Sequence, residues 1–178
     1  MRIAICGAHA VGKTSLVNAL ADVFPDHSIV DEPYHALTAL GHIFEDPPSA
    51  ADFEAQLEFS IESARNTGDN VIFDRCPADL LAYLAESASA DVVATYWTRS
   101  QEAVTMLDLV IYLPVERPDR IHVSASEYPR LRRRVDRRLR HCFQEDGLLP
   151  ESVLLREVSG SVRERIKSVL GALSSGRA

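Results

Sequence analysis

The sequence predicts an α/β protein whose core is an open parallel sheet. Three observations favour this fold class. Short apolar segments of strand length recur along the chain, at residues 3–6, 28–31, 70–74, 108–115 and 153–158. Segments with apolar residues at every third or fourth position follow them, which is typical of helices with one buried face. The run at 109–113 is apolar at successive positions, as in a strand covered on both faces.

The first strand and helix enclose a loop, residues 7–14, that fits the pattern G-x-x-x-x-G-K-[ST] without mismatch. Its two glycines allow a sharp turn and a close approach to a ligand. Successive N–H groups then form an anion nest, strengthened by the positive end of the following helix. A plain glycine-rich turn is the alternative, but the flanking strand and helix favour a phosphate-binding loop. The residues expected at the nucleotide are Gly7, Ala8, His9, Ala10, Val11, Gly12, Lys13, Thr14 and Ser15, the last as a helix residue after the loop.

Two side chains of this loop carry specific expectations. The Lys13 ammonium is expected on the β- and γ-phosphates of a nucleotide, and the Thr14 hydroxyl on Mg²⁺. Lys13 is one of only two lysines among 19 basic residues, the other being Lys167, so a lysine inside the loop is unlikely to be incidental.

The second strand ends in two acids, Asp31 and Glu32, followed by Pro33, which stops regular structure. In open parallel sheets this strand end lies where ligands bind. We therefore expect Glu32 to be a catalytic carboxylate. The alternative is a turn in which Asp31 caps the next element.

A short helix at residues 34–41 and a longer one that starts near 49 and stops at Gly68 are predicted next. The longer helix opens with a capping-box pattern at Ser49 to Asp52. Three polar residues lie off its apolar stripe and face either a substrate cleft or water: Gln56, Glu58 and Arg65.

The third strand ends in Asp74, and Arg75 follows at once. An Asp at this point can hold the hydration shell of Mg²⁺ beside the Thr14 hydroxyl. Arg75 would stabilise charge on the acceptor or on the transferring phosphoryl group. In the alternative interpretation, Asp74 caps the helix that opens at Pro77, and Arg75 is its surface partner. Convergence of two strand ends on one loop favours the catalytic interpretation.

Helices are expected at residues 77–88 and 90–106 before the fourth strand. The second of them carries Tyr96 and Trp97, which either stack on a substrate base or pack in the core. After the fifth strand, Ser159 and Gly160 form a loop, and a capping box at 161–164 opens the last helix.

The segment from about 116 to 146 contains an amphipathic helix with a narrow apolar seam and an arginine coat: Arg130, Arg132, Arg133, Arg134, Arg137, Arg138 and Arg140. One interpretation is a solvated face in which Asp136 pairs with Arg132 and Arg140. A second is a mobile lid that brings guanidinium groups onto phosphates, and a third is a nucleic-acid-binding patch.

We favour a lid from which one or two arginines reach the phosphates. Spacing alone does not rank the candidates Arg130, Arg133, Arg134 and Arg137. Our provisional site places Arg134 among the catalytic residues and Arg130 and Arg133 among the nucleotide-binding ones.

Composition narrows the function classes. The 178 residues predict one domain, 1–178, and 46% hydrophobic with 25% charged residues is ordinary for a soluble protein. No apolar run approaches the length of a membrane span, no signal segment precedes the first strand, and Cys6, Cys76 and Cys142 suggest neither disulfides nor a zinc site. We expect a cytoplasmic protein, either a monomer or a homodimer. The net charge of -7 disfavours a dedicated nucleic-acid binder.

Together these motifs resemble the phosphate-loop (P-loop) small-molecule kinases, especially the deoxynucleoside and nucleotide kinases and the nicotinamide-riboside-kinase-like ATP-binding proteins. Glu32-Pro33 looks like the Glu-Pro after their second strand, where the Glu is a general base, and Asp74-Arg75 looks like their acid-Arg pair. Cys76 stands where deoxynucleoside kinases usually have Ser. The resemblance implies a three-layer P-loop NTPase fold with a five-stranded parallel sheet in the order 2-3-1-4-5, helices on both faces and an Arg-rich lid.

The resemblance also implies a function. ATP with Mg²⁺ would donate its γ-phosphoryl group to a hydroxyl or phosphate of a small acceptor, such as a nucleoside, a nucleotide or a related metabolite. Glu32 would take the proton of an alcohol or only position a phosphate, Gln56 would contact the acceptor, and Ser159-Gly160 would lie near the adenine. The rivals are a regulatory ATPase switch that acts on a macromolecule and a nucleic-acid-end kinase. A GTPase is disfavoured because the chain lacks an N-K-x-D motif.

Overall fold

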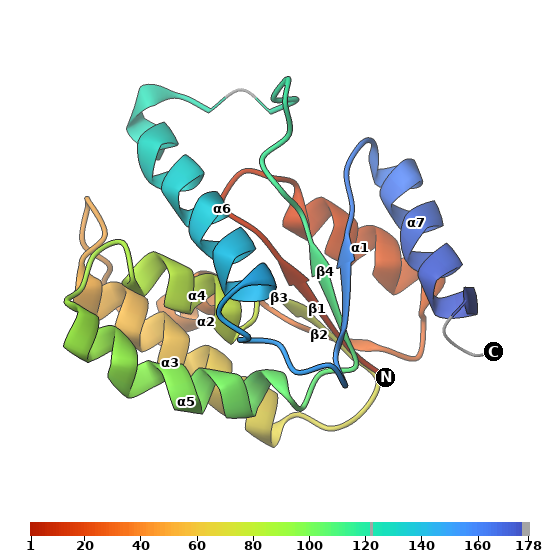
Figure 1. The fold of residues 1–178 in the computed structure, drawn as a ribbon, viewed down its shortest axis with the longest axis horizontal. Helices are drawn as coiled ribbons and strands as arrows, with labels where there is room; N and C mark the ends of the chain where they lie inside the picture. The colour runs from red at the N-terminus through yellow and green to blue at the C-terminus, as the bar shows by residue number, and fades with distance from the viewer. Residues whose placement is uncertain (122, 176–178) are drawn as a thin grey trace.

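A parallel sheet in the order β2-β3-β1-β4-β5 forms the centre of the protein in a computed structural model that describes residues 1–121 and 123–175 (Figure 1). The predicted strand order is confirmed. The strands are β1 (Arg2–Cys6), β2 (Ser28–Val30), β3 (Val71–Asp74), β4 (Leu109–Tyr112) and β5 (Leu154–Glu157).

The central strand β1 is buried on both faces because helices cover both sides of the sheet. Its residues Ile3 to Cys6 have no exposed surface. In its register Ile5 pairs with Asp74 of β3 and Cys6 pairs with Tyr112 of β4. The carboxyl ends of the three central strands therefore reach the same edge of the sheet, where the loop after β1 begins.

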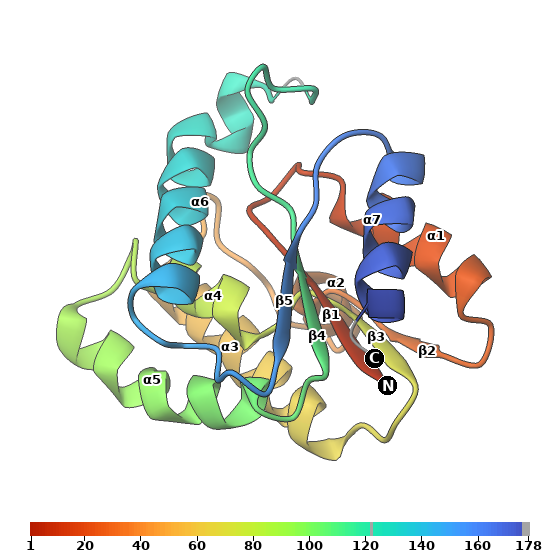
Figure 2. The same cartoon turned by 45° about the vertical axis from the view of Figure 1, so that its right-hand side comes forward.

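Helices form a layer on each face of the sheet, as Figure 2 shows with the sheet seen nearly edge-on. One layer consists of α1 (Lys13–Val23) and α7 (Val162–Ser175), which pack on each other. The other layer consists of α3 (Ala50–Asn66), α4 (Pro77–Leu84), α5 (Ala90–Val104) and α6 (Pro129–Gln144). The short α2 (Pro33–Ala39) packs on α3, and a 3-10 turn, η1 (Ala125–Glu127), precedes α6. No helix among the described residues is long and apolar enough to cross a bilayer.

Helix α4 differs from the expected element at 77–88, because it ends at Leu84. All eight of its residues are buried, since α4 packs against α3, α5 and α6. This position places the amino end of α4 directly beneath the loop after β1.

The aromatics of α5 pack rather than face the site. The Tyr96 hydroxyl donates to Glu54 of α3 at 3.2 Å, and Trp97 lies in a groove beside the end of α4. Glu58 and Arg65 also pair with α5, through Arg99 and Glu102, so these two residues of α3 do not reach a substrate cleft.

Candidate active site

Two glycines determine the path of the loop after β1. Gly7 has φ 151°, and a Cβ there would lie 2.5 Å from the carbonyl oxygen of Leu113. Gly12, the N-cap of α1, has φ 85°. Side chains at either position would therefore strain the backbone or clash with it. The two glycines therefore allow the sharp turns that the sequence motif predicts.

The outward carbonyls of the loop accept hydrogen bonds from buried cationic side chains. The five pairs, in chain order, are Gly7 with Arg75 Nη1 (3.3 Å), Ala8 with Lys13 Nζ (2.9 Å), His9 with Arg132 Nε (2.9 Å), Ala10 with Arg132 Nη2 (3.0 Å) and Val11 with Arg165 Nη1 (2.8 Å). Because C=O and N–H of a trans peptide point to opposite sides, fixing these carbonyls directs most of the intervening N–H groups to the other face. The carbonyls of residues 7 to 11 are thus neutralised by four cationic side chains, of which Lys13 belongs to the loop itself.

The surroundings of Lys13 in this loop change the pKa of its side chain. Its side chain is buried, and burial together with the nearby Arg75 guanidinium lowers the pKa of Lys13 to about 8. Its ammonium donates a hydrogen bond to the Ala8 carbonyl, and from there it can reach a bound anion.

This pKa predicts a pH dependence of nucleotide binding. Phosphates bind the charged form of Lys13, so affinity for ATP should be flat below pH 8. Above pH 8 binding must first return the proton to Lys13, and affinity should fall by up to about tenfold per pH unit. Calorimetry from pH 7 to pH 9.5 in buffers of different ionisation enthalpy should show proton uptake on the alkaline side. Lys13→Ala is the control and should show neither effect.

Thr14 and Asp74 meet, as the strand ends predict. The Thr14 hydroxyl donates to Asp74 Oδ2 at 2.7 Å. The other oxygen, Asp74 Oδ1, is buried and has no hydrogen-bond partner among the described residues. Burial raises the pKa of Asp74, and the negative charge of Glu32 adds to this effect. A hydroxyl and a carboxylate with a spare buried oxygen form a donor set that fits Mg²⁺.

Glu32 and Arg75 form a partly buried ion pair between the ends of β2 and β3. Arg75 is 7% exposed and has φ 87°, and its guanidinium also lies over the Tyr83 ring. Burial alone would lower the pKa of Arg75, but Glu32, Tyr83 and Asp79 together raise it. Burial likewise favours a neutral Glu32, yet Arg75 and Lys13 outweigh it and lower the pKa of Glu32. Both groups are therefore charged at neutral pH.

The interpretation of Asp74 as a helix cap and Arg75 as its surface partner is wrong. Cys76 is the N-cap of α4, and Asp79, three residues on, completes the capping box. Asp79 is fully buried, and its other oxygen accepts the Gly7 N–H at 2.6 Å. Sequence reasoning missed Asp79, although a residue two after Pro77 is the position from which a capping box is closed.

A cavity of about 350 Å³ joins the loop to the ion pair. Its polar residues include Glu32, Gln56 and Arg75, and the loop contributes His9 and Ala10. Gln56 is 6% exposed and donates to the Asp52 carbonyl at 3.2 Å. The remaining wall is largely aromatic and aliphatic: Tyr34, Pro48, Phe53, Leu80, Tyr83, Tyr128 and Leu131.

His9 ties this cavity to the segment before α6. Burial lowers the pKa of His9 to about 4, so the imidazole is neutral. Its backbone N–H donates to the Tyr83 hydroxyl at 2.7 Å, and its ring nitrogens lie 2.8 Å from that hydroxyl and 2.7 Å from the Glu127 carbonyl. Tyr83, which the sequence motifs did not indicate, therefore holds the loop in place through His9.

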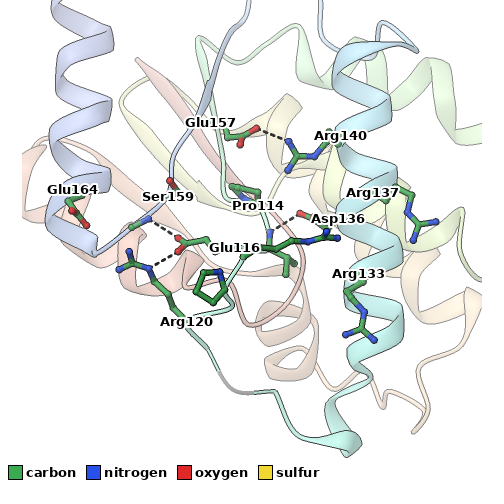
Figure 3. Close-up of a pocket in the computed structure, with 14 residues that line it drawn as sticks. Pro114, Glu116, Arg120, Arg133, Asp136, Arg137, Arg140, Glu157, Ser159 and Glu164 are labelled. Carbon is green, nitrogen blue, oxygen red and sulfur yellow. Dashed lines mark hydrogen bonds and ion pairs between the residues drawn. The ribbon is translucent and has the colours of Figure 1, made fainter.

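A second, larger cavity of about 900 Å³ lies between α6 and the ends of β4 and β5 (Figure 3). Ser159, Gly160 and Arg133, three of the predicted nucleotide-binding residues, line it. Figure 3 shows Arg140 reaching across this cavity to Glu157, which it contacts at 3.2 Å.

The α6 arginine that contacts the phosphate loop is not one of those expected at the nucleotide. Arg134 pairs with Glu86 at 2.7 Å and Arg130 is exposed, so neither touches the loop in this structure. Arg132 of α6 contacts the loop at the His9 carbonyl, and it also pairs with Asp119. The predicted pairing of Asp136 with Arg132 and Arg140 is wrong, because Asp136 Oδ1 accepts from the Tyr112 hydroxyl at 2.6 Å and from the Val115 N–H at 2.9 Å.

A family model described as an AAA domain matches residues 2–165. No curated protein matches the sequence. Among solved structures, the deoxyadenosine kinase of M. mycoides with bound dATP is 15% identical, with 98% of this chain and 100% of that chain covered and a TM-score of 0.59. The shikimate kinase of Aquifex aeolicus vf5 is 13% identical, with 99% and 98% covered and a TM-score of 0.59.

The NadR protein in complex with NAD and AMP-PNP is 16% identical, with a TM-score of 0.68. Here 98% of this chain is covered but only 49% of the other, so the chain spans about half the length of NadR. Identities this low show a shared fold. The predicted resemblance to the P-loop small-molecule kinases is confirmed at that level.

Proposed function

The chain belongs to the AAA-domain family, and on that premise we propose that it is an ATP-dependent kinase that phosphorylates a small molecule. The proposed acceptor is a nucleoside, a nucleotide or a related metabolite. Residues 1–178 then form one catalytic unit with a lid at about 116–146, which acts in the cytoplasm as a monomer or a homodimer.

One observation carries this proposal: the 350 Å³ cavity opens onto both the phosphate loop and the Glu32–Arg75 pair. Its volume suits a small ligand and its wall combines apolar surface with a few polar groups, as in typical small-molecule sites. A switch that acts on a macromolecule does not need a pocket for a small acceptor beside its phosphate site. The pocket therefore favours a transferase over the regulatory ATPase.

The lining of the cavity favours an acceptor with a flat ring. Phe53 stacks on Tyr83 with ring centroids 5.1 Å apart, and Tyr34 and Tyr128 contribute further aromatic surface. Gln56 adds an amide that can both donate and accept at the edge of a base. A nucleoside satisfies both features, with its hydroxyl end directed to Glu32.

In the proposed mechanism the chain acts mainly by positioning and charge. The N–H groups of the loop and Lys13 hold the phosphates, and Arg75 stabilises charge near the acceptor. Thr14 and Asp74 would hold Mg²⁺, which supplies neutralising charge for the phosphate oxygens when bound. The ionised Glu32 accepts the proton of an alcohol acceptor, whereas a phosphate acceptor needs no base.

The nucleoside half of ATP is assigned to the 900 Å³ cavity, where Ser159 and Gly160 form one wall and Arg133 of α6 lies opposite. This assignment leaves the smaller cavity free for the acceptor. The smaller cavity contacts the phosphate loop through His9 and Ala10, and the larger one is linked to it through Glu116 and Arg165.

An ATP-consumption screen against nucleosides, nucleotides, nicotinamide riboside and simple sugars tests the proposal. Turnover should require an acceptor and Mg²⁺. Acceptor-independent hydrolysis, unaffected by Glu32→Gln, would instead favour the switch. Phosphorylation of oligonucleotide ends, with steep salt dependence of binding, would favour the nucleic-acid-end kinase.

A further inference from the structure

The guanidinium of Arg165 lies beneath the phosphate loop, although Arg165 follows Val11 of the loop by 154 residues in the chain. The side chain is 7% exposed. Nη1 donates to the Val11 carbonyl at 2.8 Å, and Nη2 donates to Glu116 Oε1 at 3.0 Å. Arg165 is therefore oriented by two partners at once, one in the loop and one after β4.

Glu116 connects this pair to the wall of the large cavity. The same Oε1 atom accepts the Gly160 N–H at 2.7 Å, and Oε2 contacts Arg120 Nε at 2.7 Å. Figure 3 shows Glu116 between Arg120 and the segment that carries Ser159. A continuous chain of contacts thus runs from the Val11 carbonyl through Arg165 and Glu116 to Gly160.

The Val11 carbonyl belongs to the peptide whose N–H is that of Gly12. Because a trans peptide directs its C=O and N–H to opposite sides, the bond from Arg165 points the Gly12 N–H toward the nest. Gly12 itself has φ 85°, a region that glycine enters and leaves freely, so this peptide needs an external restraint. A Cβ at Gly12 would lie 3.1 Å from Arg165 Nη1, which shows how closely the guanidinium approaches.

We propose that Arg165 is a positioning residue for phosphate binding, held in place by Glu116. It orients the Gly12 N–H and adds fixed positive charge behind the loop without touching the phosphates. This inference rests on the proposed function, since it assumes that the loop binds a polyphosphate. A purely structural role is the alternative, in which Arg165 only fastens α7 to the rest of the fold.

Inorganic tripolyphosphate is the probe, because it reports on the phosphate site without a base or an acceptor. Its Kd should be measured by calorimetry for wild type, Arg165→Met and Arg165→Lys, with thermal unfolding of the free proteins alongside. Arg163→Met is the matched control, since Arg163 is an exposed arginine of the same helix. We expect Kd to rise at least about tenfold in Arg165→Met and to remain at the wild-type value in the control.

Arg165→Lys separates positioning from charge. Lysine keeps the charge but lacks the fork that serves Val11 and Glu116 together, so its Kd should lie between those of wild type and Arg165→Met. If Arg165→Met does not fold, the lysine variant carries the test. A lysine or methionine variant that unfolds at a lower temperature yet binds tripolyphosphate as tightly as wild type would overturn the inference.

Lys13→Ala distinguishes this inference from the proposed function. Loss of tripolyphosphate binding in Lys13→Ala with unchanged binding in Arg165→Met would remove only the role of Arg165. Wild-type binding in Lys13→Ala would remove the phosphate loop as the binding site, and the proposed function with it.

Discussion

Lys13→Ala should lower kcat at least about 10³-fold. Lys13 is the cation of the loop that can leave its backbone partner, Ala8, and follow the transferring phosphoryl group. The arginines behind the loop face its carbonyls and do not substitute for it. Coupled ATP-consumption assays on the best acceptor of the screen measure the effect.

Lys167→Ala is the matched control, because Lys167 is the other lysine of the chain and is exposed on α7. It should retain wild-type turnover. Unfolding temperature should be unchanged or slightly raised in Lys13→Ala, since removing Lys13 relieves a charge that burial disfavours. Turnover within about tenfold of wild type would contradict the assignment of Lys13 to the reacting phosphates.

The strand-end part of the site could be predicted from the sequence because each piece is local. A glycine pattern between a strand and a helix defines the loop, and an acid after an apolar run marks the end of a parallel strand. Glu32, Asp74 and Arg75 were predicted this way, and the structure brings them together beside Lys13. The parallel register of β1 and β3 brings the carboxyl ends of both strands to the same edge of the sheet.

The residues behind the loop were not predicted, because they come from helix faces. Arg132 and Arg165 reach the loop only once α6 and α7 are packed. A signal was nevertheless present. Arg132 lies three residues before Val135 and seven before Leu139, and Arg165 lies four before Val169, so both arginines share the buried face of their helix. An arginine on an apolar seam is the one to select from an arginine-rich helix.

The positions of the cysteines along the sequence also did not predict that two of them lie close together in the structure. Cys6 and Cys76 are far apart in the sequence, yet their sulfur atoms and an oxygen of Asp79 lie within 4.8 Å of one another beneath the loop. Burial raises the pKa of Cys6, so this thiol is protonated and packs as a small apolar group. Cys76 is also buried below the loop, where it is the N-cap of α4.

Glu32→Gln should lower kcat by about 10²- to 10⁴-fold if the acceptor is an alcohol, with little change in ATP affinity. Glu32 lines the acceptor cavity and is ionised, because Arg75 and Lys13 outweigh the effect of burial on its pKa. Glutamine keeps the shape and the contact to Arg75 but cannot accept the proton. Arg75 would retain the Gly7 carbonyl and Asp79, at 3.3 and 3.7 Å, so the variant should fold.

The adjacent carboxylate provides the control for this prediction. Asp31 is exposed at the same strand end, and Asp31→Asn should leave kcat unchanged. The size of the effect in Glu32→Gln also reports on the acceptor, since a phosphate acceptor carries no proton that must be removed at neutral pH. A large loss with alcohols therefore identifies Glu32 as the base, whereas a small loss with a phosphorylated acceptor limits it to positioning that substrate through Arg75. Full activity of Glu32→Gln with an alcohol would contradict a catalytic role for the carboxylate.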